Sequence, residues 1–211
     1  MFHFKTNEVV TPSQLADLFQ VKTLKHSRFI KETNTLILIS DYTKGTHLNK
    51  WIGDTLHFTG NHKLTGSTYS KLADSRTNGV TIHLFQVMNP GEYTYCGPTK
   101  LVGDPYTEMG SDNHLVWVFP IRPNHPHGVS KPNGLVFSDM DDFKNRGDQS
   151  IRHFIRRRDN YIGYQVRHIE HGLGTVQNFD GKIITVTFEN HQTKTYNFDK
   201  SINGGFLKFT A

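Results

Sequence analysis

WIGDTLHFTG, residues 51–60, is the stretch of the 211-residue sequence that says most about the fold. Apolar and polar side chains alternate in its second half, which predicts a strand over Thr55–Thr59. The strand leads into Phe58-Thr59-Gly60, an aromatic ring followed by a hydroxyl and by a residue without Cβ. Gly60 lets another group approach the backbone closely. The neighbouring sequence extends this pattern in both directions.

Four further blocks flank this stretch in a fixed order, and each is rich in apolar or aromatic residues. They are LILISDYTKG (36–45), ADSRTNGVTIHLFQV (73–87), GEYTYCGPTKLVGDPYTE (91–108) and VWVFPI (116–121). Together with residues 51–60 they resemble the SET- and RING-associated (SRA) domain in the form found in McrA-type bacterial restriction proteins. That family reads modified bases in DNA. The resemblance covers about 100 of the 211 residues.

The resemblance implies a pocket that receives one base flipped out of the duplex, where an aromatic ring stacks on the base and polar groups read its edge. Phe58 matches the stacking aromatic, and Thr59 and Gly60 match the Thr-Gly that follows it. The family's cytosine-reading acid lies nine residues before the aromatic, where this chain has Asn49. Asparagine both donates and accepts hydrogen bonds, so modified cytosine and a different base both stay open. Thr46 and His47 complete the candidate pocket.

A polar loop follows the Thr-Gly motif at the place where the family inserts a loop into a groove of the DNA. It consists here of Asn61, His62 and Lys63, and an ordinary polar turn is the alternative reading. Lys44 and Lys50 flank the candidate pocket and are candidate phosphate contacts.

Composition narrows the class of protein. No apolar run approaches the roughly 20 residues that a membrane span needs. The first residues lack the basic and apolar regions of a signal peptide, so a cytoplasmic protein without a membrane partner is expected. Cys96 is the only cysteine, which excludes an internal disulfide and a multi-cysteine zinc site.

Positive charge is concentrated in one segment. The chain has a formal net charge of +5 and a pI of about 9.2, which suits a polyanionic partner. Within residues 144–158, Lys or Arg stands at six positions and Asp148 is the acidic residue. A solvated helix face is the alternative explanation. The candidate phosphate contacts in this segment are Arg152, Arg156, Arg157 and Arg158.

Local patterns predict the elements around these sites. Thr11 followed by Pro12 is typical of a helix start. The pattern predicts strands over Thr35–Ser40, Val80–Val87, Tyr93–Gly97 and Leu115–Pro120, and short helical spacing over Ser67–Ser75. Three prolines and two glycines in residues 122–134 predict a loop. The apolar spacing of residues 139–158 predicts a helix that is interrupted near Gly147.

The last part of the chain has a different character. Residues 171–198 alternate well, with turns expected at Asp180-Gly181 and Asn190-His191, which predicts a small antiparallel barrel. Its HGLGTV start and VTFE strand look like the Tudor- or SH3-like barrel of some bacterial helicases. The fold class is therefore expected to be α+β and mostly β. An SRA/PUA-like twisted β-barrel with short helices (1–125) would precede a loop and basic helical connector (126–165) and a small Tudor/SH3-like barrel (166–211).

No group of residues has the spacing of a known catalytic site, so neither a catalytic residue nor a metal or cofactor is assigned. His125 and His127 lie in a proline-rich loop, and His168 and His171 have no evident third ligand. The resemblance implies a reader of a modified base, most simply cytosine, that flips the base and acts in modification-dependent restriction or phage defence. Its partner would be duplex DNA carrying that base. A separate nuclease or helicase subunit is a further candidate partner.

Two alternatives stay open beside this reading. An unrecognised modification-dependent nuclease would cleave DNA when a divalent metal is added. An RNA-binding or protein-docking module would prefer RNA in competition with modified DNA.

Overall fold

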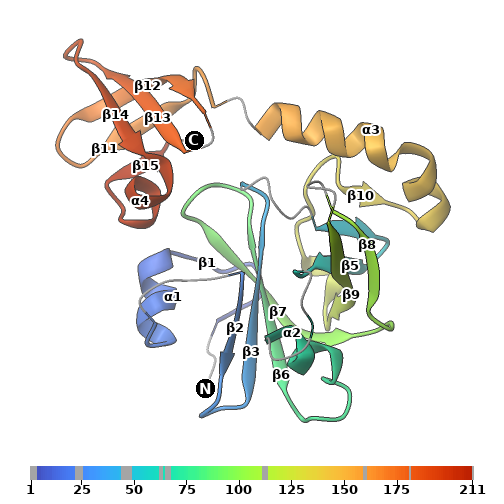
Figure 1. Ribbon diagram of the computed structural model, residues 1–211. Coiled ribbons are helices and arrows are strands. Elements are labelled where there is room, and N and C mark those ends of the chain that lie inside the picture. The colour runs from blue at the N-terminus through green and yellow to red at the C-terminus, as the bar shows by residue number, and fades with distance from the viewer. Residues whose placement is uncertain are drawn as a thin grey trace.

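The computed structural model describes residues 4–21, 26–43, 49–61, 64, 68–110, 114–158, 161–180 and 182–210, with the backbone alone for 153–158 and 199. Two β-sheets dominate it, and helix α3 (Met140–Arg158) runs between them (Figure 1). The mostly β class with short helices is thereby confirmed. No helix among the described residues is both long and apolar enough to cross a membrane.

The larger sheet contains ten strands and curls around a core. Its strand order is β10-β4-β5-β9-β7-β6-β3-β2, with β1 paired to β7 and β8 paired to β9. The strands are β1 (Val9–Val10), β2 (Ser27–Ile30), β3 (Thr35–Asp41), β4 (Lys50–Ile52), β5 (Thr55–Thr59), β6 (Thr81–Val87), β7 (Tyr93–Leu101), β8 (Tyr106–Met109), β9 (Leu115–Pro123) and β10 (Val136–Phe137). Helices α1 (Pro12–Leu18) and α2 (Thr68–Ala73) and the short 3-10 helix η1 (Pro126–Gly128) accompany it.

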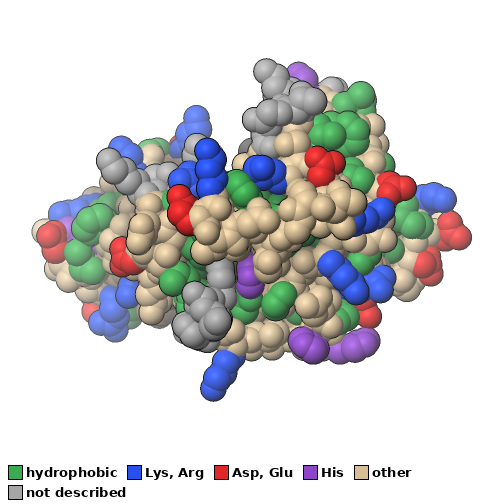
Figure 2. Space-filling model, turned by 90° about the horizontal axis from the view of Figure 1, so that it is seen from below, with side chains coloured by type: hydrophobic (Ala, Val, Ile, Leu, Met, Phe, Trp, Pro, Cys, Tyr) green, Lys and Arg blue, Asp and Glu red, His purple; other side chains and the backbone are tan. Residues whose placement is uncertain are grey.

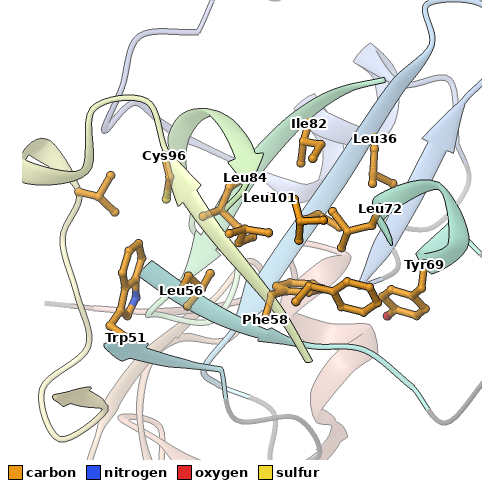
Figure 3. Close-up of a cluster of buried hydrophobic side chains, with 14 residues drawn as sticks. Leu36, Trp51, Leu56, Phe58, Tyr69, Leu72, Ile82, Leu84, Cys96 and Leu101 are labelled. Atoms are coloured by element: carbon orange, nitrogen blue, oxygen red, sulfur yellow. The ribbon is translucent and has the colours of Figure 1, made fainter. Parts of the chain in front are cut away.

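The predicted β-rich elements of this part are present. Strand β3 is buried at six successive positions, as expected for a run of β-branched and aliphatic residues. Thr11 caps α1, since its hydroxyl accepts a hydrogen bond from the Gln14 N–H while the Gln14 side chain accepts from the Thr11 N–H. The largest core cluster includes Trp51, Phe58 and Phe119, all fully buried. Figure 3 shows Tyr69 and Leu72 toward one end of the cluster and Trp51 at the other end, with Phe58 between Trp51 and Tyr69.

The predicted loop at residues 122–134 leads back into the larger sheet. Beyond it, β10 pairs in parallel with β4, with Val136 opposite Trp51. Leu135 and Phe137 are fully buried there. The chain therefore contributes to this sheet well past residue 125 and leaves it only through α3.

Helix α3 is continuous, so the predicted interruption near Gly147 is wrong. Gly147 serves packing instead, because a Cβ at this position would lie 2.6 Å from the ring of Phe143. That ring packs edge-on against Phe137 at 5.0 Å, and the Arg146 guanidinium lies 4.8 Å from the Phe137 ring centre. Arg146 also donates to the carbonyl of Val136 and pairs with Asp142. The first half of the basic segment is thus anchored on β10.

The smaller sheet has five antiparallel strands in the order β14-β13-β12-β11-β15 and its own core. The expected turn at residues 180–181 includes Asp180, whose carboxylate accepts from the N–H groups of Lys182 and Ile183. At the second expected turn His191 adopts a φ of 61°. The elements are β11 (Gln165–His168), β12 (Gly172–Phe179), β13 (Ile183–Phe188), β14 (Thr193–Asn197), α4 (Phe198–Asn203) and β15 (Leu207–Phe209). Its likeness to a Tudor or SH3 barrel stays a prediction.

Candidate base-binding seam

The end of β5 lies at a seam of the curled sheet, where its described pairing with β4 ends. Strand β4 pairs with β5 only as far as Lys50 opposite His57, while β9 continues along the other side of β5 to Thr59. Within the described part of the chain, no strand pairs with the N–H and C=O of Thr59 on the β4 side. Two side chains take these groups instead, and they come from opposite ends of the sheet.

Asn49 closes one side of this seam. Its Oδ1 accepts from the Thr59 N–H at 2.7 Å, and its Nδ2 donates to the Ser40 hydroxyl at 2.8 Å. Asn49 and Ser40 are both fully buried. The amide thus connects the end of β3 to the end of β5, which explains why a residue that both donates and accepts fits here.

His26 closes the other side. Its Nε2 donates to the carbonyl of Thr59 at 2.8 Å, and its ring stacks on Phe58 with 4.5 Å between the ring centres and 16° between the planes. The imidazole is half-buried, whereas Phe58 is fully buried. We call the group His26, Ser40, Asn49, Phe58 and Thr59 the seam cluster.

Asn49, Phe58 and Thr59, three of the sequence-predicted pocket residues, thus meet at one place. Gly60 follows them, and the space beside it is filled, because a Cβ there would lie 2.9 Å from the Phe119 ring and 3.2 Å from the Tyr69 ring. Asn61 is exposed, and its carbonyl accepts from the Trp117 N–H. The predicted residues Lys44, Thr46, His47, His62 and Lys63 lie outside the described residues.

Lys50 is placed differently from what a phosphate contact requires. Only 4% of its side chain is exposed, and its ammonium donates to both carboxylate oxygens of Glu108 at 2.6 and 2.5 Å. The ammonium also lies 4.5 Å from the ring centre of Phe143 on α3. In this arrangement the charge of Lys50 is already neutralised, and the residue ties α3 to the strand that follows Asn49.

The remaining basic candidates lie on α3. Arg152 is exposed, and the side chains of Arg156, Arg157 and Arg158 lie outside the described part of the chain. On the face of the molecule seen from below, Lys and Arg alternate with Asp and Glu and do not form a single basic patch (Figure 2). That face lies away from α3, which runs along the upper side of the larger sheet in Figure 1.

A group of two histidines and a glutamate in the smaller sheet has the composition of a metal site. His168, Glu170 and His171 hold their ligand atoms within 4.8 Å of one another, so Glu170 is the third candidate ligand that spacing alone did not reveal. However, Lys194 Nζ lies 2.9 Å from His171 Nε2, and the Glu170 N–H donates to His168 Nδ1. The two imidazole rings are stacked, with 4.6 Å between their centres and 13° between their planes. Each nitrogen lone pair lies in the plane of its own ring, so the lone pairs of two stacked rings do not converge on one ion.

A cavity of about 980 Å³ lies between the two sheets. Tyr42 and Thr43 contribute from the end of β3, and Tyr161 and Tyr164 from the start of the smaller unit. Among the described residues that line it, the charged ones are Glu92 and Lys208, one of each sign. A polyanion needs several cations, and the described lining supplies one.

Two buried histidines give the larger sheet a predicted sensitivity to acid. Burial lowers the pKa of His57 to about 4, helped by the nearby Lys50 charge, and burial also lowers the pKa of His83 to about 4. Both folded-state values lie below the unfolded value near 6.5, so the unfolded chain binds more protons and stability falls as pH drops from about 6.5 to 4. We expect each histidine to contribute roughly 2–3 kcal/mol to that loss.

Urea denaturation at pH 7 and at pH 4.5 measures this effect. The variant with His57→Gln and His83→Gln should lose clearly less stability between the two pH values than the unaltered protein. Equal losses in the two proteins would contradict the assignment of the acid sensitivity to these imidazoles.

Solved structures with a similar arrangement include SRA domains in complex with DNA. The SUVH5 SRA domain in complex with fully methylated CG DNA is 17% identical over 57% of this chain and 90% of that chain, with a TM-score of 0.44. The SUVH5 SRA domain bound to fully hydroxymethylated CG DNA is 16% identical over 57% and 89%, also with a TM-score of 0.44. Arabidopsis thaliana SUVH6 in complex with SAM is 18% identical over 62% and 27%, with a TM-score of 0.45.

No protein-family model and no curated protein matches the sequence. The structural similarities have low identity and TM-scores below 0.5. The function is therefore inferred from the chain's own residues.

Proposed function

We propose that this protein binds duplex DNA and reads a modified base, which it takes out of the duplex into the seam cluster. The observation that carries the proposal is the meeting of Asn49 with the Phe58-Thr59 segment where the described β4–β5 pairing ends. A flipped base needs a flat ring to stack on and polar groups at its edge. The seam cluster brings together the Phe58 ring, which the His26 ring covers in this structure, and the Asn49 amide. The solved structures with methylated and hydroxymethylated CG DNA contain SRA domains, the kind of domain that this sequence resembles.

Modified cytosine is the base we propose. Asn49 stands where the family has its cytosine-reading acid, and its amide carries an acceptor for the cytosine amine as well as a donor. Thr46 and His47 precede Asn49 in the chain and would complete the pocket, and Lys44 would contact a phosphate beside it. The residues Asn61, His62 and Lys63 would enter a groove. A role in modification-dependent restriction or phage defence follows from the resemblance to McrA-type proteins. Cleavage would then come from a separate protein.

A binding panel tests the proposal. Matched duplexes carrying unmodified, methylated, hydroxymethylated or glucosylated cytosine, phosphorothioate, or modified adenine are titrated at fixed salt, with RNA as competitor. We expect one modified cytosine duplex to bind at least about tenfold more tightly than the unmodified duplex, a difference of about 1.4 kcal/mol. Equal affinity for all duplexes, or preference for RNA, would overturn the proposal.

The basic end of α3 should supply affinity without base preference. Phosphate contacts release counterions, so changing Arg156, Arg157 and Arg158 together to Gln should flatten the slope of log affinity against log salt by roughly one to three units. Modified and unmodified duplexes should weaken about equally, because phosphate contacts position the protein and do not specify sequence. Lys144→Gln is the matched control, because Lys144 pairs with Asp141 at the other end of the helix. An unchanged slope in the folded triple variant would place the DNA path away from α3.

A further inference from the structure

His26 makes, within the protein, the same two kinds of interaction that a flipped base would need at the seam: stacking on a ring and a hydrogen bond at the ring edge. Its planar ring is stacked on Phe58 at 4.5 Å, and its N–H donates to the backbone carbonyl of Thr59 at 2.8 Å. Stacking on an aromatic ring and a hydrogen bond from the ring edge are the two interactions by which flipped bases are held. The imidazole thus occupies the place that the base would need.

The position of His26 in the chain allows its side chain to leave. It directly precedes β2, whose pairing with β3 begins at Ser27, and its own carbonyl accepts from the Ile39 N–H at 2.9 Å. The backbone is therefore fixed while the half-buried ring lies at the surface of the seam. A rotation about the side-chain bonds would take the ring off Phe58 without breaking the β2–β3 ladder.

We propose that His26 is a plug that fills the base position in the free protein and that the flipped base displaces it from Phe58. This inference rests on the proposed function. It adds a requirement on the ligand, because the incoming base has to replace the N–H that His26 gives to the Thr59 carbonyl. The exocyclic amines of cytosine and adenine can do so, whereas the corresponding group of thymine is an acceptor.

The plug has a measurable consequence for affinity. If His26 fills the pocket in most molecules of the free protein, only the remaining fraction can accept a base. The measured affinity is then the affinity of the open pocket multiplied by that fraction. Removing the ring should therefore strengthen binding to a duplex that inserts a base. The effect should be absent for a duplex that binds only through its phosphates.

The test compares His26→Ala with the unaltered protein on the preferred modified duplex and on its unmodified counterpart. One stacking contact and one hydrogen bond correspond to an expected gain of about five- to thirty-fold for the modified duplex. The unmodified duplex should change by less than about twofold, since it makes no use of the pocket. His125→Ala is the matched control, because His125 is exposed and distant in sequence from the seam cluster. It should change neither affinity.

A second measurement uses the unaltered protein and does not depend on how the variant folds. In the free protein the His26 ring protons should show the ring-current shift caused by Phe58. Adding the modified duplex should remove that shift, and adding the unmodified duplex should leave it in place.

Several results would overturn the plug. Weaker or unchanged binding of His26→Ala to the modified duplex would do so, as would a ring-current shift that persists in the modified complex. In each case the unaltered protein would still prefer the modified duplex, so the proposed function would stand. A protein with no preference for any modified duplex would instead contradict the function and the plug together.

Discussion

Phe58→Ala is expected to lower the free energy of unfolding by about 3–5 kcal/mol, the usual cost of removing a buried phenylalanine. The ring is fully buried and belongs to the largest core cluster, so its removal leaves a cavity. Binding to the modified duplex should fall as well, but part of that fall would reflect unfolded protein. Phe58→Ala alone therefore cannot separate a structural ring from a base-stacking ring.

Phe58→Leu makes this separation. Leucine keeps most of the apolar volume, so the loss of stability should stay below about 1.5 kcal/mol. The flat stacking surface is lost, and affinity for the modified duplex should drop by about 1–3 kcal/mol, the value of one base–aromatic stack. Thermal melting and titration of the two duplexes measure the two effects separately.

Phe85→Leu is the matched control, because Phe85 is equally buried but belongs to the second core cluster. It should reproduce the loss of stability and leave affinity unchanged. If Phe58→Leu keeps full affinity for the modified duplex, Phe58 is a core residue and the base pocket lies elsewhere.

The sequence predicted those parts of the structure that depend on neighbours in the chain. Strand β3 follows from a run of β-branched and aliphatic residues, and α1 follows from its capping residues. The local pattern of α3 wrongly predicts a break at Gly147, because glycine is unfavourable inside a helix. The glycine makes room for the Phe143 ring, a side-chain contact that hydropathy spacing does not show.

The sequence predicts only part of the seam cluster, because several of its contacts join residues that are far apart in the chain. The motif located Asn49 and Phe58, but His26 has no motif of its own and lies 33 positions from Thr59. Lys50 and Glu108 are 58 positions apart, so sequence inspection presented Lys50 as a free cation. The parallel pairing of β10 with β4 was also missed. Contacts that close a curled sheet join distant segments, and such contacts leave no periodic signal.

Asn49→Ala should be the most damaging single change at the seam apart from the removal of Phe58. It leaves the buried Thr59 N–H without a partner and removes one of the partners of the Ser40 hydroxyl, which also interacts with Tyr42. An unsatisfied buried group costs about 1–3 kcal/mol and a lost hydrogen bond about 0.5–1.5 kcal/mol, so the free energy of unfolding should fall by roughly 2–4 kcal/mol. The remaining folded protein should also show a smaller preference for the modified duplex, because the amide that reads the base edge is gone.

Asn49→Asp separates the structural role of this residue from its proposed role in reading the base. A carboxylate can still accept from the Thr59 N–H, and the Ser40 hydroxyl can rotate to donate to it, so both buried groups keep a partner. Burial disfavours the charged form and raises the pKa of the new carboxyl, so the variant should lose stability relative to the unaltered protein as pH rises. Binding to modified cytosine should be preserved or improved, because an acceptor suits the cytosine amine. Denaturation at pH 5 and pH 8, with titrations of both duplexes, measures these effects. Identical preference ratios for the unaltered protein, Asn49→Ala and Asn49→Asp would show that Asn49 only joins β3 to β5 and reads no base.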